Sequence, residues 1–267
     1  MACEWAALLP HPPVIVSEVG KGREKTAAKT LQGFTKVHNS VQGCAAGLEA
    51  LVVLSPHAPY VPDALFVNTA PSSSGNFSRF GAPALSMRWS SPGPLLQELA
   101  SLLKQASIPA AYGQVADVTA DHGAMVPLRL LESAFLDGRI PPVIHANPSG
   151  LTHGQALALG QVLALLAKSR SIALLASGDL SHKLKEDGPY GFHPAGPVFD
   201  KAVVDALEAG SPDPLLSLAP DILENAAECG LRPCLALLGL CKKPLTVFSC
   251  EGPFGVGYCT AFTSSIS

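Results

Sequence analysis

The sequence predicts an α/β fold in a single domain over residues 1–267. Short apolar runs typical of strands alternate with segments of helical periodicity, and several of the runs stop abruptly at a polar cluster. Of the 267 positions, 48% are hydrophobic and only 15% are charged, against about 25% charged in an average domain. The sequence contains neither an internal repeat nor a clear linker, so we expect one large core.

The strands are predicted from apolar runs that end at proline, glycine or polar residues. Pro10 and Pro56 follow the first two runs, and proline ends a strand because it has no N–H to donate to the ladder. The run at 172–176 is apolar throughout, as expected of a strand buried on both faces, and leads directly into the polar segment 177–182. The predicted strands span residues 5–9, 50–54, 65–68, 143–146, 172–176, 246–249 and 258–263.

The helices are predicted from apolar spacing and capping residues. Leu95, Leu99 and Leu103 share one helical face, and Thr152 is a capping residue for the helix that follows it. The predicted helices span residues 24–39, 95–106, 126–136, 153–168, 198–208, 214–218 and 232–240. Two segments rich in Ser, Pro or Gly interrupt the pattern: 70–94, a long excursion or an irregular hairpin, and the loop 186–197. We expect both to shape the substrate pocket.

Composition excludes several classes of partner. Lys and Arg total 18 against 21 for Asp and Glu, and no basic run interleaves with aromatic residues, so we expect neither a nucleic acid nor a membrane as partner. Glu4 and Pro10 lie where an export signal requires a basic start and an unbroken apolar stretch. The longest apolar stretch, 156–167, is shorter than the ~20 residues that span a bilayer.

The cysteines are odd in number and contain no CxxC pair. In a chain without a visible export signal, this pattern predicts reduced thiols in a cytoplasmic protein and neither a disulfide framework nor a zinc knuckle. The cysteines are Cys3, Cys44, Cys229, Cys234, Cys241, Cys250 and Cys259.

Three histidines follow strand-like runs closely. His11, His57 and His182 lie one to six residues beyond such runs, where an open α/β sheet forms its ligand crevice. Imidazole is a common metal ligand and also titrates near pH 7, so the three together predict a metal site, an acid/base site or both. His193, in the Pro/Gly loop, either faces the pocket as part of a lid or is solvated.

The remaining polar candidates have two readings each. Asp179 and the segment Asp121-His122-Gly123 either orient a histidine or make local turns. Glu228 and Cys229 precede a glycine and a helix start, so one of them can point into a cavity, whereas otherwise they are a surface charge and a small core residue. The three other histidines, at positions 38, 145 and 153, are assigned to structure.

Several common motifs are missing from the sequence. There is no G-x-S-x-G elbow for a serine nucleophile, and Ser177 lacks that setting. Neither a P-loop nor a G-x-G-x-x-G segment after the first strand is present, which excludes the common nucleotide-dependent classes.

Six short motifs, taken in order, resemble the LigB superfamily, which comprises the class III extradiol ring-cleavage dioxygenases and their relatives, including the Memo proteins. Each motif is short, but together they span nearly the whole chain. They are Pro10-His11-Pro12-Pro13, Ser55-Pro56-His57, Asp121-His122-Gly123, Ser177-Gly178-Asp179-Leu180-Ser181-His182, Glu228-Cys229-Gly230-Leu231-Arg232-Pro233 and Gly252-Pro253-Phe254-Gly255-Val256-Gly257-Tyr258.

The resemblance implies an α/β/α domain with a central mixed sheet and a non-haem Fe(II) ion bound by two histidines and a glutamate. Carried over by motif, the ligands are His11, His57 and Glu228, a set that leaves coordination positions open for a catecholate and dioxygen. His182 matches the family's catalytic base and later acid, and His122 is a second acid/base or orienting group.

The same resemblance implies the partners. They are a small aromatic substrate of the catechol or aminophenol type and O₂, with Asp179 and His193 expected to contact the substrate. A homo-oligomer or a small partner subunit is compatible with the family.

Cys229 is an alternative third ligand, because the Memo-like relatives carry Cys where the dioxygenases carry Glu. A thiolate favours Cu(I) or Zn(II) over Fe(II) and argues against dioxygen activation. We prefer Glu228, because hard oxygen donors suit Fe(II). The leading hypothesis is therefore an Fe(II)-dependent extradiol dioxygenase. Its alternatives are a Memo-like metal-binding or redox protein without dioxygenase activity, and a metal-assisted hydrolase that binds Zn(II).

Overall fold

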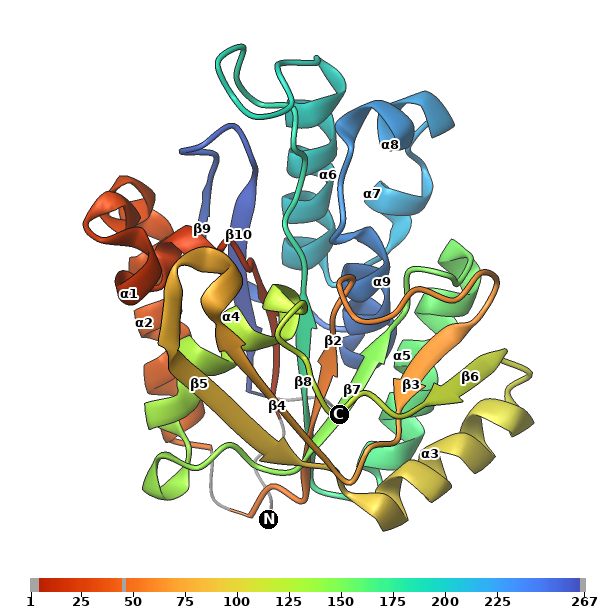
Figure 1. Cartoon of the computed structure of the whole chain (residues 1–267). Helices are drawn as coiled ribbons and strands as arrows, with labels where there is room; N and C mark the ends of the chain where they lie inside the picture. Colours follow the sequence, from red (N-terminus) through yellow and green to blue (C-terminus); the bar gives the residue numbers. More distant parts are fainter. Residues whose placement is uncertain (1–4, 45–46, 265–267) are drawn as a thin grey trace.

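The computed structural model describes residues 5–44 and 47–264. A mixed eight-stranded sheet forms its centre, in the order β6-β3-β7-β2-β8-β1-β10-β9, and β4 and β5 form a separate two-stranded sheet (Figure 1). The strands are β1 (Ala6–Leu9), β2 (Ala50–Leu54), β3 (Leu65–Asn68), β4 (Ser72–Phe77), β5 (Ala82–Ser90), β6 (Ala110–Gly113), β7 (Val143–Asn147), β8 (Ile172–Ser177), β9 (Thr246–Glu251) and β10 (Tyr258–Thr263).

The middle of the sheet is parallel. Neighbouring strands β1, β8, β2 and β7 run in the same direction, so their carboxyl ends meet at one edge of the sheet. On one side β10 and β9 add antiparallel strands, and on the other β3 pairs antiparallel with β7 and carries β6. The predicted α/β fold with a central mixed sheet is confirmed.

Helices cover both faces of the sheet (Figure 1). Alternate strand residues divide between two cores: Leu8 and Val52 pack with α3, α5, α6 and α9, while Ala7 and Val53 pack with α2, α4 and the β4–β5 hairpin. The helices are α1 (Ser17–Gly20), α2 (Ala28–Gln42), α3 (Gly93–Gln105), α4 (His122–Leu131), α5 (His153–Ala167), α6 (Ala195–Ala209), α7 (Asp213–Leu216), α8 (Pro220–Ala226) and α9 (Leu231–Cys241).

Helices α5 and α9 approach each other backbone to backbone. A Cβ atom on Gly160 would lie 2.0 Å from the carbonyl oxygen of Ala236, and one on Gly239 would lie 2.1 Å from that of Leu157. Only glycine fits at both positions. At the start of α5, Thr152 forms the predicted cap, reinforced by a reciprocal hydrogen bond from its backbone N–H to the side chain of Gln155.

The main differences from the predicted helices lie at α4 and α8. The helix predicted at 126–136 begins four residues earlier, at His122, because the Asp121 carboxylate accepts from the Ala124 N–H and caps it, and it ends at Leu131. Helix α8 was not predicted. The segment 70–94 contains the β4–β5 hairpin and a 3₁₀ turn, Ser78–Phe80, which is the irregular-hairpin alternative.

Two further expectations concern cysteines and membranes. Cys3 lies outside the described residues, and no disulfide links Cys229, Cys234, Cys241, Cys250 and Cys259. None of the helices described above combines the length and apolar character needed to cross a bilayer.

Candidate metal centre

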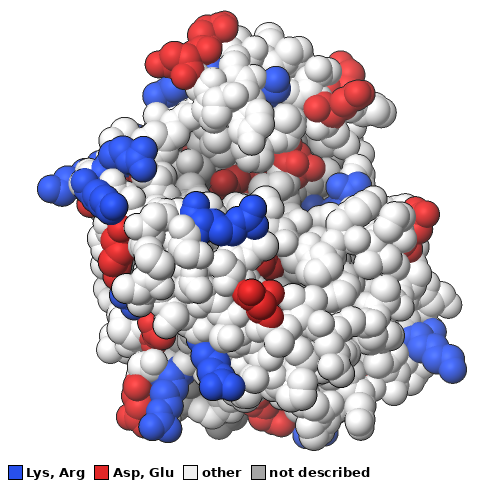
Figure 2. All heavy atoms as spheres, in the orientation of Figure 1, with Lys and Arg blue, Asp and Glu red and all other residues white. Residues whose placement is uncertain are grey.

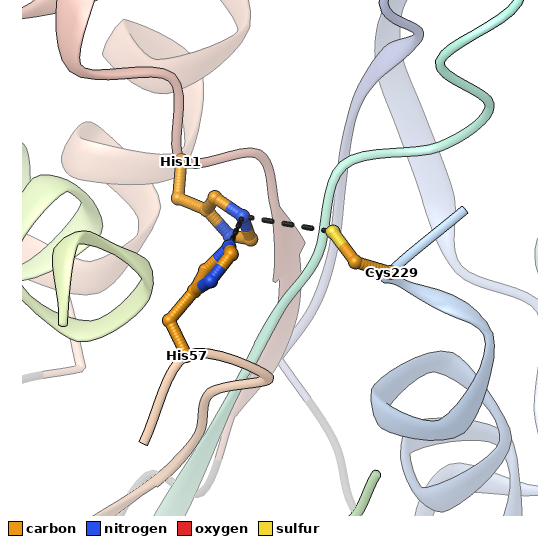
Figure 3. Close-up of side chains that lie close together, drawn as sticks. All are labelled: His11, His57 and Cys229. Carbon is orange, nitrogen blue, oxygen red and sulfur yellow. Dashed lines mark hydrogen bonds between the residues drawn. The ribbon is translucent and has the colours of Figure 1, made fainter. Parts of the chain in front are cut away.

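His11, His57 and Cys229 come together at the carboxyl edge of the parallel strands. His11 follows β1, His57 follows β2, and Cys229 lies in the turn between α8 and α9. Nε2 of His57 lies 3.0 Å from Nε2 of His11, and Sγ of Cys229 lies 3.7 Å from the same atom. Figure 3 shows the two imidazoles and the thiol directed toward one another. The three potential ligand atoms all lie within 4.8 Å of one another.

Hydrogen bonding selects one tautomer of His11. Its Nδ1 lies 2.8 Å from Oγ of Ser177, and that hydroxyl donates its proton to the carbonyl oxygen of Gly123 at 2.5 Å. Since the hydroxyl proton is already used, Oγ accepts from Nδ1–H. The lone pair of His11 Nε2 is therefore directed toward His57 and Cys229, as a metal ligand requires.

The Gly123 carbonyl is available because of Pro127. In a regular helix this carbonyl would accept from the N–H of residue 127, but proline has none. The orphaned carbonyl, in the first turn of α4, accepts from Ser177 at the end of β8 instead. A proline inside a helix thus frees the acceptor that orients a site histidine.

The electrostatic environment keeps the imidazoles neutral. Burial, and then the charge of His57, hold the pKa of His11 well below its usual value, and burial also lowers the pKa of His57. Asp179 accepts from the backbone N–H of His11 at 2.8 Å, and burial raises its pKa to about 6. Neutral imidazole is the form that binds a metal ion.

Two imidazoles and a thiol fit a soft or borderline cation. Burial, followed by the nearby carboxylates Asp179 and Glu228, raises the pKa of Cys229 well above its usual value, so without a cation this residue is a neutral thiol. Metal binding would displace its proton. The donor set and the orientation of His11 therefore suit a metal ion, with Cys229 as the sulfur ligand.

Glu228, the preferred third ligand in the sequence analysis, is not part of this group. Its Oε2 accepts from the backbone N–H of Leu231 at 2.6 Å, so the carboxylate caps the amino end of α9. The preceding Ala227 has a left-handed backbone with φ of 53°, which costs about 1–2 kcal/mol for a residue with a Cβ. After this turn the side chain of Glu228 points toward the start of α9, whereas that of Cys229 points toward the histidines.

His182 lies beside the group with its own tautomer defined. Its Nδ1 bonds to the carbonyl oxygen of Ala227, so Nδ1 carries the proton and Nε2 has a free lone pair. The Tyr190 ring stands edge-on to the imidazole, with 5.1 Å between ring centroids. His182 is therefore placed to accept a proton through Nε2.

His122, the first residue of α4, stacks against His57. The centroids of the two rings are 4.0 Å apart, and Phe80 of the β4–β5 hairpin lies 5.5 Å from His122 on an edge-on ring contact. Burial, and then the charges of His11 and His57, lower the pKa of His122 to about 3. The hairpin and the loop at 186–197, which carries Tyr190, thus each contribute an aromatic ring near the histidines.

His193 has a local role in the structure. Its Nδ1 accepts from the backbone N–H of Ala195 at 3.1 Å, at the start of α6. The backbone N–H of His193 donates to the backbone carbonyl of Lys183. Its expected contact with a substrate stays a prediction.

Figure 2 shows that the visible face of the molecule is hollowed, with Asp and Glu side chains inside the hollow and Lys and Arg side chains on its rim.

Comparison with known proteins assigns the family. The family model described as the catalytic LigB subunit of aromatic ring-opening dioxygenase matches residues 5–262. This chain belongs to the LigB family. The resemblance expected from its six motifs is confirmed, and the LigB family includes metal-dependent dioxygenases.

Two similar proteins extend this LigB assignment. Protein CA_C1420 of Clostridium acetobutylicum is 33% identical over 263 residues, covering 94% of this chain but 55% of the relative, so the chain spans about half the length of that protein. An uncharacterized protein, JW3007, from Escherichia coli K12 has a crystal structure with a TM-score of 0.62 and 19% identity, covering 97% of this chain and 99% of that one. The latter likeness concerns the fold.

Sequence reasoning missed several supporting residues of this LigB-family site. His145, assigned to structure, is buried in β7 of the same sheet, and its Nε2 lies 2.7 Å from Oδ2 of Asp121. The available signal was its position in β7, one of the parallel strands that end at this edge. Ser55 and Ser177 had the same signal, because each follows or ends such a strand, but serine is too common there to single out.

Proposed function

We propose that this LigB-family chain is a metal-binding protein whose ion, Cu(I) or Zn(II), is held by His11, His57 and Cys229. The observation that supports this most is the place of Cys229, with Sγ 3.7 Å from His11 Nε2, while the Glu228 carboxylate caps α9. A thiolate with two imidazoles favours these ions over Fe(II). The function supported best is therefore the Memo-like one, metal binding or redox chemistry without ring opening.

The bound ion and the residues around its three ligands would have separate roles. Bound at this place, Zn(II) would supply a Lewis acid and Cu(I) a one-electron redox couple. His182 can accept a proton at Nε2, because its Nδ1 proton is held by Ala227. His122 stacks against His57, and the Phe80 ring makes an edge-on contact with His122, so these rings border the site.

Ring opening with Fe(II) is the second candidate. It is favoured by the LigB match and by His182, whose free Nε2 suits removal of a proton from a catechol or aminophenol hydroxyl. Fe(II) held at His11 and His57 would supply a redox-active ion with open coordination positions. The rings of Phe80 and Tyr190 could then contact a flat aromatic substrate.

Metal analysis combined with oxygen uptake separates these functions. The chain would be purified without oxygen, analysed for Fe, Cu and Zn, and reloaded with each ion before exposure to a panel of catechols and aminophenols. About one Cu or Zn per chain, with no oxygen uptake after Fe(II) loading, is the result we expect. Bound iron with substrate-dependent oxygen uptake would contradict our proposal and establish the dioxygenase. Ester or amide hydrolysis by the zinc-loaded chain would instead indicate the hydrolase.

A further inference from the structure

Asp121 lies at the centre of a buried hydrogen-bond network behind the histidines. Asp121 is 3% exposed. Its Oδ1 accepts from Oγ of Ser55 at 2.6 Å and from the backbone N–H of Ala124 at 3.0 Å. Oδ2 pairs with Nε2 of His145 at 2.7 Å. Burial acts to raise the pKa of Asp121, but the bonds from His145, Ser55 and Ala124 lower it to about 2. The group is thus an ionised carboxylate inside the molecule.

Two of these bonds reach the segments that carry site histidines. Oγ of Ser55 also accepts from the backbone N–H of His57 at 3.2 Å, which ties Asp121 to the turn after β2. The N–H of Ala124 belongs to the first turn of α4, whose first residue is His122. A Cβ on Gly123 would lie 2.3 Å from Ser55 Oγ and 3.2 Å from His57 Cδ2, so the helix and the turn are in direct contact.

His145 supports the second oxygen of Asp121. The residue is 1% exposed, and the edge of its ring contacts Trp89, with 6.2 Å between centroids. Among the residues that the structure describes, its Nδ1 has no hydrogen-bond partner. A buried polar atom without a partner costs free energy. The bond to Asp121 is therefore the polar contact that this imidazole makes within the described chain.

We propose that Asp121 is a positioning residue of the metal centre and its buried counter-charge, with His145 as its support. The inference rests on the proposed function, because it requires a cation at His11, His57 and Cys229. A buried anion attracts a nearby cation more strongly than an anion in water does. Replacing a residue that holds metal ligands in position commonly lowers metal affinity about 10–100-fold.

Asp121→Asn removes the charge and keeps the shape. The amide oxygen can still accept from Ser55 and Ala124, and the amide nitrogen can donate to His145 Nε2 when that imidazole carries its proton on Nδ1. We expect the zinc dissociation constant to rise about tenfold or more, measured by competition with a chromophoric chelator. The absorption bands of the Co(II)-loaded variant should shift as well. Asp117→Asn, on an exposed carboxylate that bonds to Thr119, is the matched control and should bind zinc like the wild type.

A pair of changes at His145 separates positioning from packing. His145→Phe fills space but donates no proton to Asp121, whereas the amide of His145→Gln can restore the bond. We expect weak zinc binding in the Phe variant and near wild-type binding in the Gln variant, with thermal unfolding of the metal-free chains as the test of folding. If Asp121→Asn does not fold, Ser55→Ala tests the link to His57 by the same assay.

The results distinguish this inference from the proposed function. Equal zinc affinity and an unchanged Co(II) spectrum in folded Asp121→Asn would overturn the role of Asp121 and leave the metal centre in place. A wild-type chain that binds none of Zn(II), Cu(I) and Fe(II) would overturn the metal centre itself, and this inference with it.

Discussion

Nδ1 of His11 lies 2.8 Å from Oγ of Ser177, a residue that follows it by 166 positions. Because Ser177 donates to the carbonyl that Pro127 leaves free on Gly123, the serine can only accept from His11. The histidine thus presents the Nε2 lone pair to His57 and Cys229. The Ser177 side chain, at the end of β8, therefore determines that Nε2 of His11 is the nitrogen available to a metal.

Ser177→Ala should weaken metal binding without unfolding the chain. Loss of the acceptor leaves Nδ1 of His11 without a partner, and the proton can then move to Nε2. We expect about a 10–100-fold rise in the zinc dissociation constant, measured by chelator competition. Ser171→Ala is the control, because this serine precedes the opposite end of β8 and its buried hydroxyl has no partner among the described residues. Equal losses in both variants would contradict the role of Ser177.

Cys229→Ser and Glu228→Gln should differ in metal content. Serine is a poor ligand for Cu(I) and Zn(II), so the first variant should lose the ion. Glutamine can still accept from the N–H of Leu231, so the second should retain it. Metal content per chain, measured by mass spectrometry after dialysis, checks both. Retention in Cys229→Ser with loss in Glu228→Gln would restore Glu228 as the third ligand.

His182→Ala should leave the metal bound. His182 bonds to Ala227 and Tyr190 flanks it, but it is not one of the three clustered donors. If the Fe(II)-loaded wild type opens aromatic rings, this change should slow the reaction about 10²–10⁴-fold, the usual contribution of an acid/base group. Oxygen uptake and metal content are measured on the same sample. Loss of metal would contradict this prediction and would mean that His182 either is a ligand or holds the Ala227 turn that positions Cys229.

Asp200→Asn should make the chain more stable at neutral pH. Burial raises the pKa of Asp200 to about 6, above 3.8 for an unfolded aspartate. Between these values the folded chain holds a proton that the unfolded chain releases, so stability falls as the pH rises from about 4 to about 6. Above this window the penalty is at most about 3 kcal/mol.

The asparagine variant removes that penalty and can still accept from the N–H of Ser181, as Asp200 does. Urea unfolding of both chains should therefore give similar free energies near pH 4 and a more stable variant at pH 7.5. A difference that does not change with pH would contradict the assignment.

Gly160→Ala should destabilise the fold. The new Cβ would lie 2.0 Å from the Ala236 carbonyl oxygen and would force α5 and α9 apart. We expect a loss of about 1–3 kcal/mol in the free energy of unfolding, or more if the helices cannot move. Gly154→Ala, on the same helix but facing open space, should be neutral or slightly stabilising. Similar stability of the two variants in urea would contradict the close helix contact.

Local chemistry was enough to predict most of the fold. The predicted strand at 50–54 is β2, and the apolar run at 172–176 is the buried strand β8. Helix α5 starts where Thr152 predicted it. The start of α4 was missed because Asp121 was read as a turn or a histidine partner, and only the folded chain shows its carboxylate on the Ala124 N–H. Helix α8 is only seven residues long, which is too short for a helical period to stand out in the sequence.

The sequence by itself determined the α/β class and the edge at which histidines gather, because polar residues mark the strand ends and alternating strands and helices favour parallel pairing. The tertiary structure decided which of Glu228 and Cys229 faces His11. That choice depends on the left-handed turn at Ala227, whose carbonyl bonds to His182, and on the end of α9 that Glu228 caps. Contacts between segments far apart in the sequence decide which of these two adjacent side chains faces the histidines. No local pattern encodes such contacts.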